Sequence, residues 1–450
     1  MKYLKKFETH TEYDAYKASE DYLTPNVSYC ADRNEVHFEK YVRDYSKEYL
    51  TTKALGTGTI SFNIFDTMGT EYITSISYST DNGNTWSTIA NEDNKENNLS
   101  IDVNMNDGGI ILWKGNAKQL GFFSEDDGEY MGSSFSSTCE FDVSGNVMSM
   151  LYGDNFIGKT DYMNTNGIFA YLFSDYYNEH TCMVKSSKDL ILPADTLADG
   201  CYHTMFTGCT SLTTAPQLPA TTLARNCYCG MFDGCTSLTT APELPVTTLA
   251  VECYYSMFKD CTSLTTAPEL PATILADGCY GYMFNGCTSL TTAPELPATT
   301  LTRGCYSDMF TGCTSLTTAP ELPADTLADD CYNTMFKGCT SLTTAPKLSA
   351  TTLARNCYSN MFDGCTSLIS APELPATKLV ISCYHNMFRN CSRLNYIKAM
   401  FTTTPSATYT SEWVSGVSST GTFVKNSAAT WNVTGVNGVP TGWTIQTASA

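Results

Sequence analysis

A 26-residue repeat, which runs without a gap from about residue 193 to residue 398, constrains this chain more than any other feature of its sequence. It occurs in eight copies, of which the first reads PADTLADGCYHTMFTGCTSLTTAPQL. One copy is too small to bury its own leucine, tyrosine, methionine, phenylalanine and cysteine side chains, but copies stacked in register join them into a continuous core. The repeat therefore predicts a solenoid of eight stacked copies.

The spacing of residues within one copy predicts two elements. Leu197, Cys201 and Met205 recur every four residues, which is typical of one apolar face of a helix. This half of the copy therefore predicts a short helix or 3₁₀ turn, which ends near Gly208. The segment 211–215, SLTTA, is rich in β-branched residues and precedes a proline, so it predicts a strand of about five residues.

The cysteines belong mainly to the repeat. Sixteen of the twenty fall into two columns, with a C-x₇-C spacing inside each copy, and the chain has only five histidines. This spacing does not suit zinc, so we expect neither a metal site nor a cofactor. Stacked cysteines could reach disulfide range, but the N-terminus has no apolar export segment, and we favour buried free thiols in a reducing compartment. Cys229 lies outside both columns and is the thiol that we expect to be most exposed.

The first 50 residues predict a leader. Thr9 and Glu12 have the spacing of a capping box that opens a short helix, and the segments 27–30 and 35–38 have the composition of a hairpin. The exposed aromatic residues of so small a part indicate attachment or oligomerisation.

The remaining segments complete a β-rich multidomain chain. Alternating apolar and polar residues between Asn-Gly and Asp-Gly turns predict an antiparallel β-sandwich. The predicted fold class is this sandwich followed by a right-handed, leucine-rich-repeat-like α/β solenoid with caps. The predicted order is a leader (1–50), the β-sandwich (51–156), an N-terminal solenoid cap (157–192), the eight repeats (193–398) and a C-terminal cap (399–450) sealed by tryptophans.

Charge and hydropathy exclude two classes of function. The 46 acidic and 26 basic residues give a net charge of -20, which argues against a duplex nucleic-acid binder. No apolar run approaches the ~18 residues needed to cross a bilayer, so we expect no membrane insertion.

Two segments resemble known families. The MFxGCTSLTTAP part of each copy resembles the core of BspA-type leucine-rich repeats, which are common in surface proteins of gut Bacteroidales. This resemblance implies a right-handed solenoid that is used for binding rather than for chemistry. The leader, KYLKKFETHTEYDAYKA followed by PNVSYCADRNEVHF, resembles the N-terminal segment of structural proteins of Bacteroides phages and prophages.

One motif raises the question of catalysis. The segment from Ser79 to Trp86, SxDxGxTW, resembles the Asp-box of sialidases. It occurs once, and residues 51–156 are too few for a propeller of four-stranded blades, so we expect a structural hairpin rather than a glycosidase site. We expect no catalytic residues, and a glycan-active enzyme stays a remote alternative.

Candidate partner-binding residues come from two surfaces of the predicted solenoid. One is a row of glutamates at the same position of successive copies, interrupted by Lys347, which could hold cations, receive a basic partner or serve only as a solubilising rim. The other is the set of positions that vary between copies on the predicted helix side, where we expect the histidines to face solvent. The candidates are Glu243, Glu269, Glu295, Glu321, Glu373, Tyr255, Tyr282, His203 and His385.

The sequence therefore predicts a non-enzymatic binding protein. Our leading prediction is a virion fibre or decoration protein of a Bacteroides phage. It would be homo-oligomeric, contact other virion proteins through its leader and bind a host-surface glycan or protein through its solenoid. The alternative prediction is a BspA-like adhesin on the bacterial cell surface.

Overall fold

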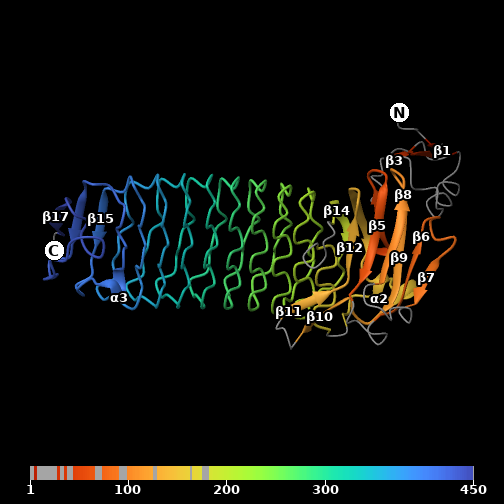
Figure 1. Ribbon diagram of the computed structural model, residues 1–450, viewed down its shortest axis with the longest axis horizontal. Helices are drawn as coiled ribbons and strands as arrows, with labels where there is room; N and C mark the ends of the chain where they lie inside the picture. The colour runs from red at the N-terminus through yellow and green to blue at the C-terminus, as the bar shows by residue number, and fades with distance from the viewer. Residues whose placement is uncertain are drawn as a thin grey trace. The chain divides into compact units, whose positions relative to one another are not determined.

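The computed structural model describes most of the chain (Figure 1). The described residues are 44–65, 73–90, 99–124, 129–162, 165–174 and 182–448, together with three short strands at 5–7, 28–30 and 35–37. The chain divides into two units, Met1–Glu48 and Tyr49–Ala450. The helix predicted to begin near Thr9 lies outside the described residues.

The first unit contains a small sheet and a 3₁₀ turn. Strand β1 (Lys5–Phe7) pairs parallel to β2 (Ser28–Cys30), which pairs antiparallel to β3 (Glu35–His37). The turn η2 (Tyr45–Lys47) follows. The hairpin predicted for the leader is therefore confirmed.

The second unit begins with three sheets. Its strands are β4 (Leu50–Ala54), β5 (Gly58–Ile64), β6 (Ile73–Ser79), β7 (Ser87–Ala90), β8 (Leu99–Met105), β9 (Ile110–Ala117), β10 (Gly121–Ser124), β11 (Glu129–Gly132), β12 (Ser134–Ser137), β13 (Phe141–Asn146) and β14 (Val184–Ile191). They form a six-stranded sheet in the order β14-β13-β4-β9-β6-β7, a three-stranded sheet β12-β5-β8 and the pair β10-β11. Pairing is antiparallel except between β13 and β14. The short helices α2 (Ser149–Tyr152) and η4 (Gly153–Asn155) follow β13.

The two larger sheets share one aromatic core. The ring centroid of Phe135 on β12 lies 4.9 Å from that of Phe62 on β5 and 5.2 Å from that of Trp113 on β9. The indole Nε1 of Trp113 donates to Thr52 Oγ1 at 2.9 Å, so its polar atom is satisfied inside the core. Side chains from the two sheets therefore exclude water together.

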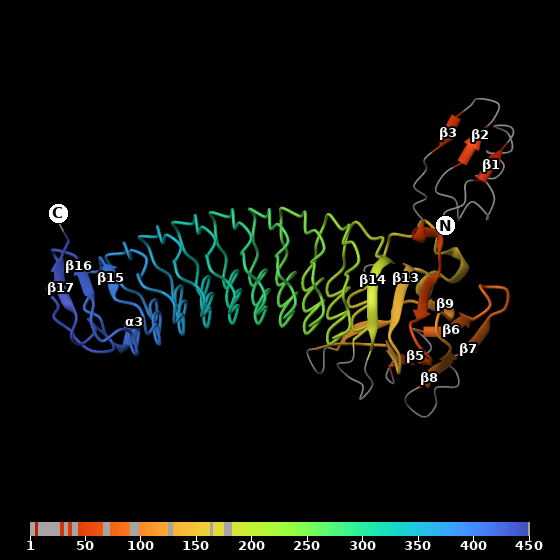
Figure 2. The same cartoon turned by 90° about the horizontal axis from the view of Figure 1, so that it is seen from above.

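Strand β14 connects these sheets to the repeats. It pairs with β13 along one edge, and Ser186 bridges Thr214 of the first copy along the other. From there, single-residue parallel bridges continue from copy to copy, as between Thr266 and Thr292. We call the stacked copies between residues 193 and 398 the repeat stack; Figures 1 and 2 show successive coils following β14.

The predicted five-residue strand is wrong, because only one residue of it bridges the next copy. In the fourth copy, the Leu290 N–H bonds back to the Cys287 carbonyl and closes a turn just before the bridge. Pro294, two residues after the bridging Thr292, has no N–H to donate. A turn and a proline therefore leave room for little more than one pairing residue.

The predicted short helix is also wrong. Gly304, Asp308 and Gly312 have φ of +58°, +57° and +74°, so every fourth residue is left-handed, which a right-handed helix does not allow. The N–H groups of these residues donate to carbonyls of the next copy at 2.7 to 3.0 Å. Ser307 and Thr311 instead bond back three residues within their own copy. We call residues 304–312 and their equivalents the turn segment; it is a series of single turns held by the neighbouring copy.

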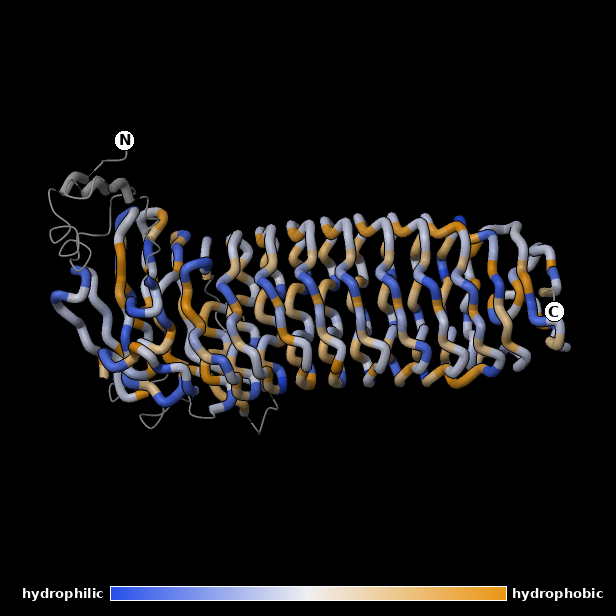
Figure 3. Tube along the Cα trace, turned by 180° about the vertical axis from the view of Figure 1, so that it is seen from behind, coloured by the Kyte–Doolittle hydropathy of each residue, from blue (hydrophilic) through white to orange (hydrophobic). Residues whose placement is uncertain are grey.

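Identical aromatic residues form two ladders inside the repeat stack. The tyrosines from Tyr202 to Tyr384 have ring centroids 5.6 to 6.0 Å apart, with nearly parallel planes. A second ladder runs from Phe173 to Phe388. Residues of similar hydropathy accordingly recur at the same position of successive coils (Figure 3).

The cysteines of both columns are buried and free. Those of the second column also donate to a carbonyl of the preceding copy, as Cys287 Sγ does to the Phe258 oxygen at 3.0 Å. Of the described cysteines, only Cys229 is partly exposed, as the sequence predicted.

The C-terminal segment covers the end of the ladders. Strands β15 (Tyr396–Ala399), β16 (Thr422–Lys425) and β17 (Thr444–Thr447) form a parallel sheet, and a single turn, α3 (Ala407–Thr410), lies between the first two. The Trp413 ring is buried 6.2 Å from Tyr384 and 6.1 Å from Phe388, the last rungs of the two ladders. None of the described helices has the length and apolarity needed to cross a membrane.

Candidate functional site

The predicted glutamate row lies on the surface. Glu243, Glu269, Glu295, Glu321 and Glu373 are all exposed, as is Lys347 in the same row. Glu373 pairs with Lys398, with Oε1 2.9 Å from Nζ. None of these glutamates lines the groove described below.

The histidines that we expected to face solvent are half-buried instead. His203 lies under Tyr130 of β11, with ring centroids 4.6 Å apart. His385 Nε2 lies 3.0 Å from the Asn386 amide nitrogen. The solvent-facing prediction is therefore wrong for His203, because the Tyr130 ring covers it, whereas His385 stays partly exposed.

The two candidate tyrosines of adjacent copies meet. Tyr255 and Tyr282 have ring centroids 5.3 Å apart. Tyr282 occupies a left-handed position of its turn segment, and the equivalent residue in all eight copies has φ between +52° and +61°. These variable positions are therefore constrained by backbone conformation.

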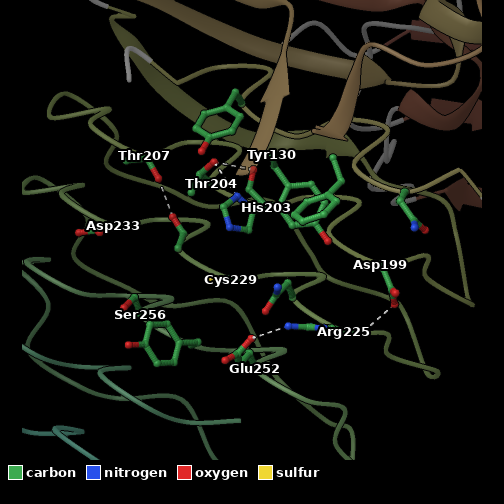
Figure 4. Close-up of a pocket in the computed structure, with 16 residues that line it drawn as sticks. Tyr130, Asp199, His203, Thr204, Thr207, Arg225, Cys229, Asp233, Glu252 and Ser256 are labelled. Atoms are coloured by element: carbon green, nitrogen blue, oxygen red, sulfur yellow. Dashed lines mark hydrogen bonds and ion pairs between the residues drawn. The ribbon is translucent and has the colours of Figure 1, made fainter. Parts of the chain in front are cut away.

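A groove of about 670 Å³ lies where the turn segments of the first three copies meet the β10-β11 pair. Figure 4 shows Tyr130 and His203 at one end, Ser256 at the other and Arg225 between Asp199 and Glu252. The lining residues are Phe123, Tyr130, Asn166, Tyr171, Asp199, His203, Thr204, Thr207, Arg225, Asn226, Cys229, Gly230, Asp233, Glu252, Tyr255 and Ser256. Of the sequence candidates, the groove brings together only His203 and Tyr255.

A glycine shapes the aromatic end of the groove. Gly200 is left-handed, with φ +58°, and a Cβ at this position would lie 2.2 Å from the Tyr130 ring. The missing side chain therefore lets Tyr130 pack on the first turn segment and over His203. Burial lowers the pKa of His203 to about 4, while burial and the nearby Asp199 raise the pKa of Tyr130 to about 12.

Arg225 organises the polar middle of the groove. Its backbone N–H donates to Asp199 Oδ1 at 3.0 Å, and its guanidinium lies 3.8 Å from the Glu252 carboxylate. Next to it, Asn226 Oδ1 is buried, and within the described part of the chain it has no hydrogen-bond partner. Asp233 pairs with Lys259 Nζ at 3.3 Å.

The thiol and the imidazole that line the groove are not activated. Burial, together with Glu252 and Asp233, raises the pKa of Cys229 to about 12, so its thiol is protonated and a poor nucleophile at neutral pH. Because the pKa of His203 is about 4, its ring is neutral and only weakly basic at neutral pH. Among the residues that the structure describes, no group of three histidine, cysteine or acidic side chains could hold a metal ion.

The Asp-box segment has the structural role predicted for it. Asp81 accepts hydrogen bonds from the Thr85 N–H at 2.9 Å and the Thr85 hydroxyl at 2.6 Å, and it joins strands β6 and β7. These bonds, together with one from Ser79, lower the pKa of Asp81 to about 2. The motif therefore stabilises a hairpin.

Sequence reasoning missed most of the groove. One available signal was the column that begins at Asp199, in which Arg225, Arg303 and Arg355 each follow an aspartate one copy earlier. In each case the arginine N–H donates to that aspartate, at 2.9 to 3.0 Å. No sequence signal placed Tyr130 opposite His203, since only the fold brings β11 to the first copy.

The fold defines a class of protein in which tandem copies of one unit stack into a continuous core. Residues 201–343 and 306–412 match the family model described as the BspA type leucine rich repeat region, in six copies. This part of the chain is therefore similar to BspA-type leucine-rich repeats, as the sequence resemblance implied. No curated protein and no solved structure matches it.

Proposed function

We propose that this chain is an adhesin-type protein of the bacterial cell surface that binds its partner without catalysis. The proposal rests on which positions of each copy are buried and which positions vary. The residues that recur in all copies, such as Tyr306 and Phe310, are buried, whereas the positions that vary lie between them on the turn segments. A stack of this kind offers an extended surface whose side chains can differ without loss of the core.

Two further observations support a binding role. The BspA-type repeats agree with the surface association and binding use that the sequence resemblance implied. The groove at the first copies contains aromatic and polar side chains, but its thiol and imidazole are not activated for chemistry. In this proposal, the separate unit Met1–Glu48 serves attachment or oligomerisation, and the repeat stack binds a host-surface glycan or protein.

Location of the native protein tests the proposal. Washed envelopes of the producing bacterium and particles purified from the same culture would be compared by quantitative mass spectrometry, and intact cells would be labelled with a membrane-impermeant reagent. We expect the protein in envelopes and labelled on intact cells. Enrichment in phage particles with absence from envelopes would refute the surface location and favour the virion role that the leader suggested. No structural observation favours that role over the surface one.

A further inference from the structure

Two of the three carboxylates that line the groove face a cationic side chain, and the third accepts a backbone N–H. Asp199 accepts the Arg225 N–H, Glu252 faces the Arg225 guanidinium, and Asp233 pairs with Lys259. A cationic ligand would have to displace these partners, and an anionic one would meet three lining carboxylates against a single lining arginine. The groove therefore favours an uncharged ligand.

Aromatic rings stand at both ends of the groove. Tyr130 covers His203 at one end, where the 42% exposed Phe123 has its ring centroid 5.0 Å from that of Tyr130. Tyr255 directly precedes Ser256, which Figure 4 shows at the other end. The face of an aromatic ring carries partial negative charge and attracts the slightly positive C–H groups of a flat apolar surface. The C–H face of a sugar ring is such a surface.

The side chains between these rings suit hydroxyl groups. The planar Arg225 guanidinium donates in a fixed fork and the Glu252 carboxylate accepts, so adjacent hydroxyls could bridge them.

We infer that the groove binds a neutral oligosaccharide, with a sugar ring stacked on Tyr255 and hydroxyls bonded to Arg225 and Glu252. The inference rests on the proposed binding function and names its ligand class. The volume of about 670 Å³ lies within the range of small-molecule sites, so a short oligosaccharide fits.

The test uses the full-length chain on an array of immobilised neutral and sialylated oligosaccharides of defined structure, with a lysine-rich peptide as the cationic probe. We expect binding to at least one neutral oligosaccharide. Arg225→Ala and Tyr255→Ala should each weaken that binding at least tenfold, because each removes a contact in the groove. Tyr255→Phe should retain it, because stacking needs the ring and not the hydroxyl.

Matched controls come from the same columns of later copies. Arg303 lies three copies after Arg225, and His385 lies five copies after Tyr255, and neither lines the groove. Arg303→Ala and His385→Ala should change neutral-sugar binding less than twofold. Equal losses in variants and controls would overturn the inference. So would the absence of binding to any neutral sugar, or binding only to sialylated sugars or the cationic peptide. If the Arg225→Ala and Tyr255→Ala proteins then still adhere to host cells, the adhesin proposal is retained and only the role of this groove is refuted.

Discussion

Replacing Gly304 by alanine tests whether the turn segment is a series of left-handed turns. Gly304 has φ +58°, and its N–H donates to the Asp329 carbonyl of the next copy at 3.0 Å. A Cβ built there would meet no heavy atom within 4 Å beyond its chain neighbours. The substitution therefore changes backbone conformational energy and little else.

The magnitude follows from two opposing contributions. A left-handed conformation costs an alanine about 1–2 kcal/mol. The lower entropy of the unfolded chain offsets about 0.4–1 kcal/mol of this. We expect Gly304→Ala to lower the free energy of unfolding by about 1 kcal/mol. Gly304 lies between Leu301 and Cys305, inside the helix that the apolar spacing predicted. In that helix the same change would raise the free energy of unfolding by about 1 kcal/mol, so the two structures predict opposite signs.

Guanidinium unfolding of the full-length chain, followed by far-UV circular dichroism, would measure the change. Gly304→Asn is the matched control, because asparagine tolerates the left-handed region and should lower the stability less than alanine does. A second comparison is Gly200→Ala in the same column, where the added Cβ would also meet the Tyr130 ring at 2.2 Å and the loss should be larger. Stabilisation by Gly304→Ala, or equal effects of alanine and asparagine, would contradict the left-handed turn.

Three further expectations concern the thiols and the covered histidine. Cys287→Ala should lower the free energy of unfolding by about 1–3 kcal/mol. Cys287→Ser should lower it by less, because serine can still donate to the carbonyl that the thiol contacts. The reverse order in denaturant melts would argue against that hydrogen bond. Alkylation of the native protein should modify Cys229 before the other described cysteines, and mass spectrometry would identify the site; equal labelling of the column cysteines would contradict their burial. His203, whose folded pKa of about 4 lies below its ordinary 6.5, should make the protein less stable as the pH falls from about 6.5 to 4, because the unfolded chain binds the proton first. NMR should show the His203 titration moving toward 6.5 in Tyr130→Ala, and an unchanged midpoint would mean that Tyr130 does not cause the shift.

The repeat period made the buried columns predictable. A residue that recurs in every copy occupies the same place in each coil, so the tyrosine, phenylalanine and cysteine columns could be assigned to the core from spacing alone. The exposed Glu243 and its equivalents followed from the same logic, since a charged row between prolines has no place in a core. The hairpin at Asp81 was likewise encoded locally, because its bonds join residues at most four positions apart.

The same period misled the assignment of local conformation. Apolar residues four positions apart match the face of a helix, but they also match turns that repeat every four residues, and burial alone does not distinguish the two. The glycine, asparagine and aspartate residues at positions such as Gly312 and Asn390 were the available signal, because they tolerate positive φ. What stabilises that conformation is the line of carbonyls on the next copy, a partner that one copy read alone does not contain.

The groove depended on tertiary structure. Tyr130 and His203 are 73 positions apart and meet only because β14 links the sheets to the first copy, while Gly200 leaves space for the tyrosine ring. Arg225 and Glu252 belong to neighbouring copies, so the register of the stack decides that they face each other. Periodic contacts between identical residues can be inferred from the chain, because every copy repeats them. A site formed where the repetition ends involves residues that occur once, and only their positions in space bring them together.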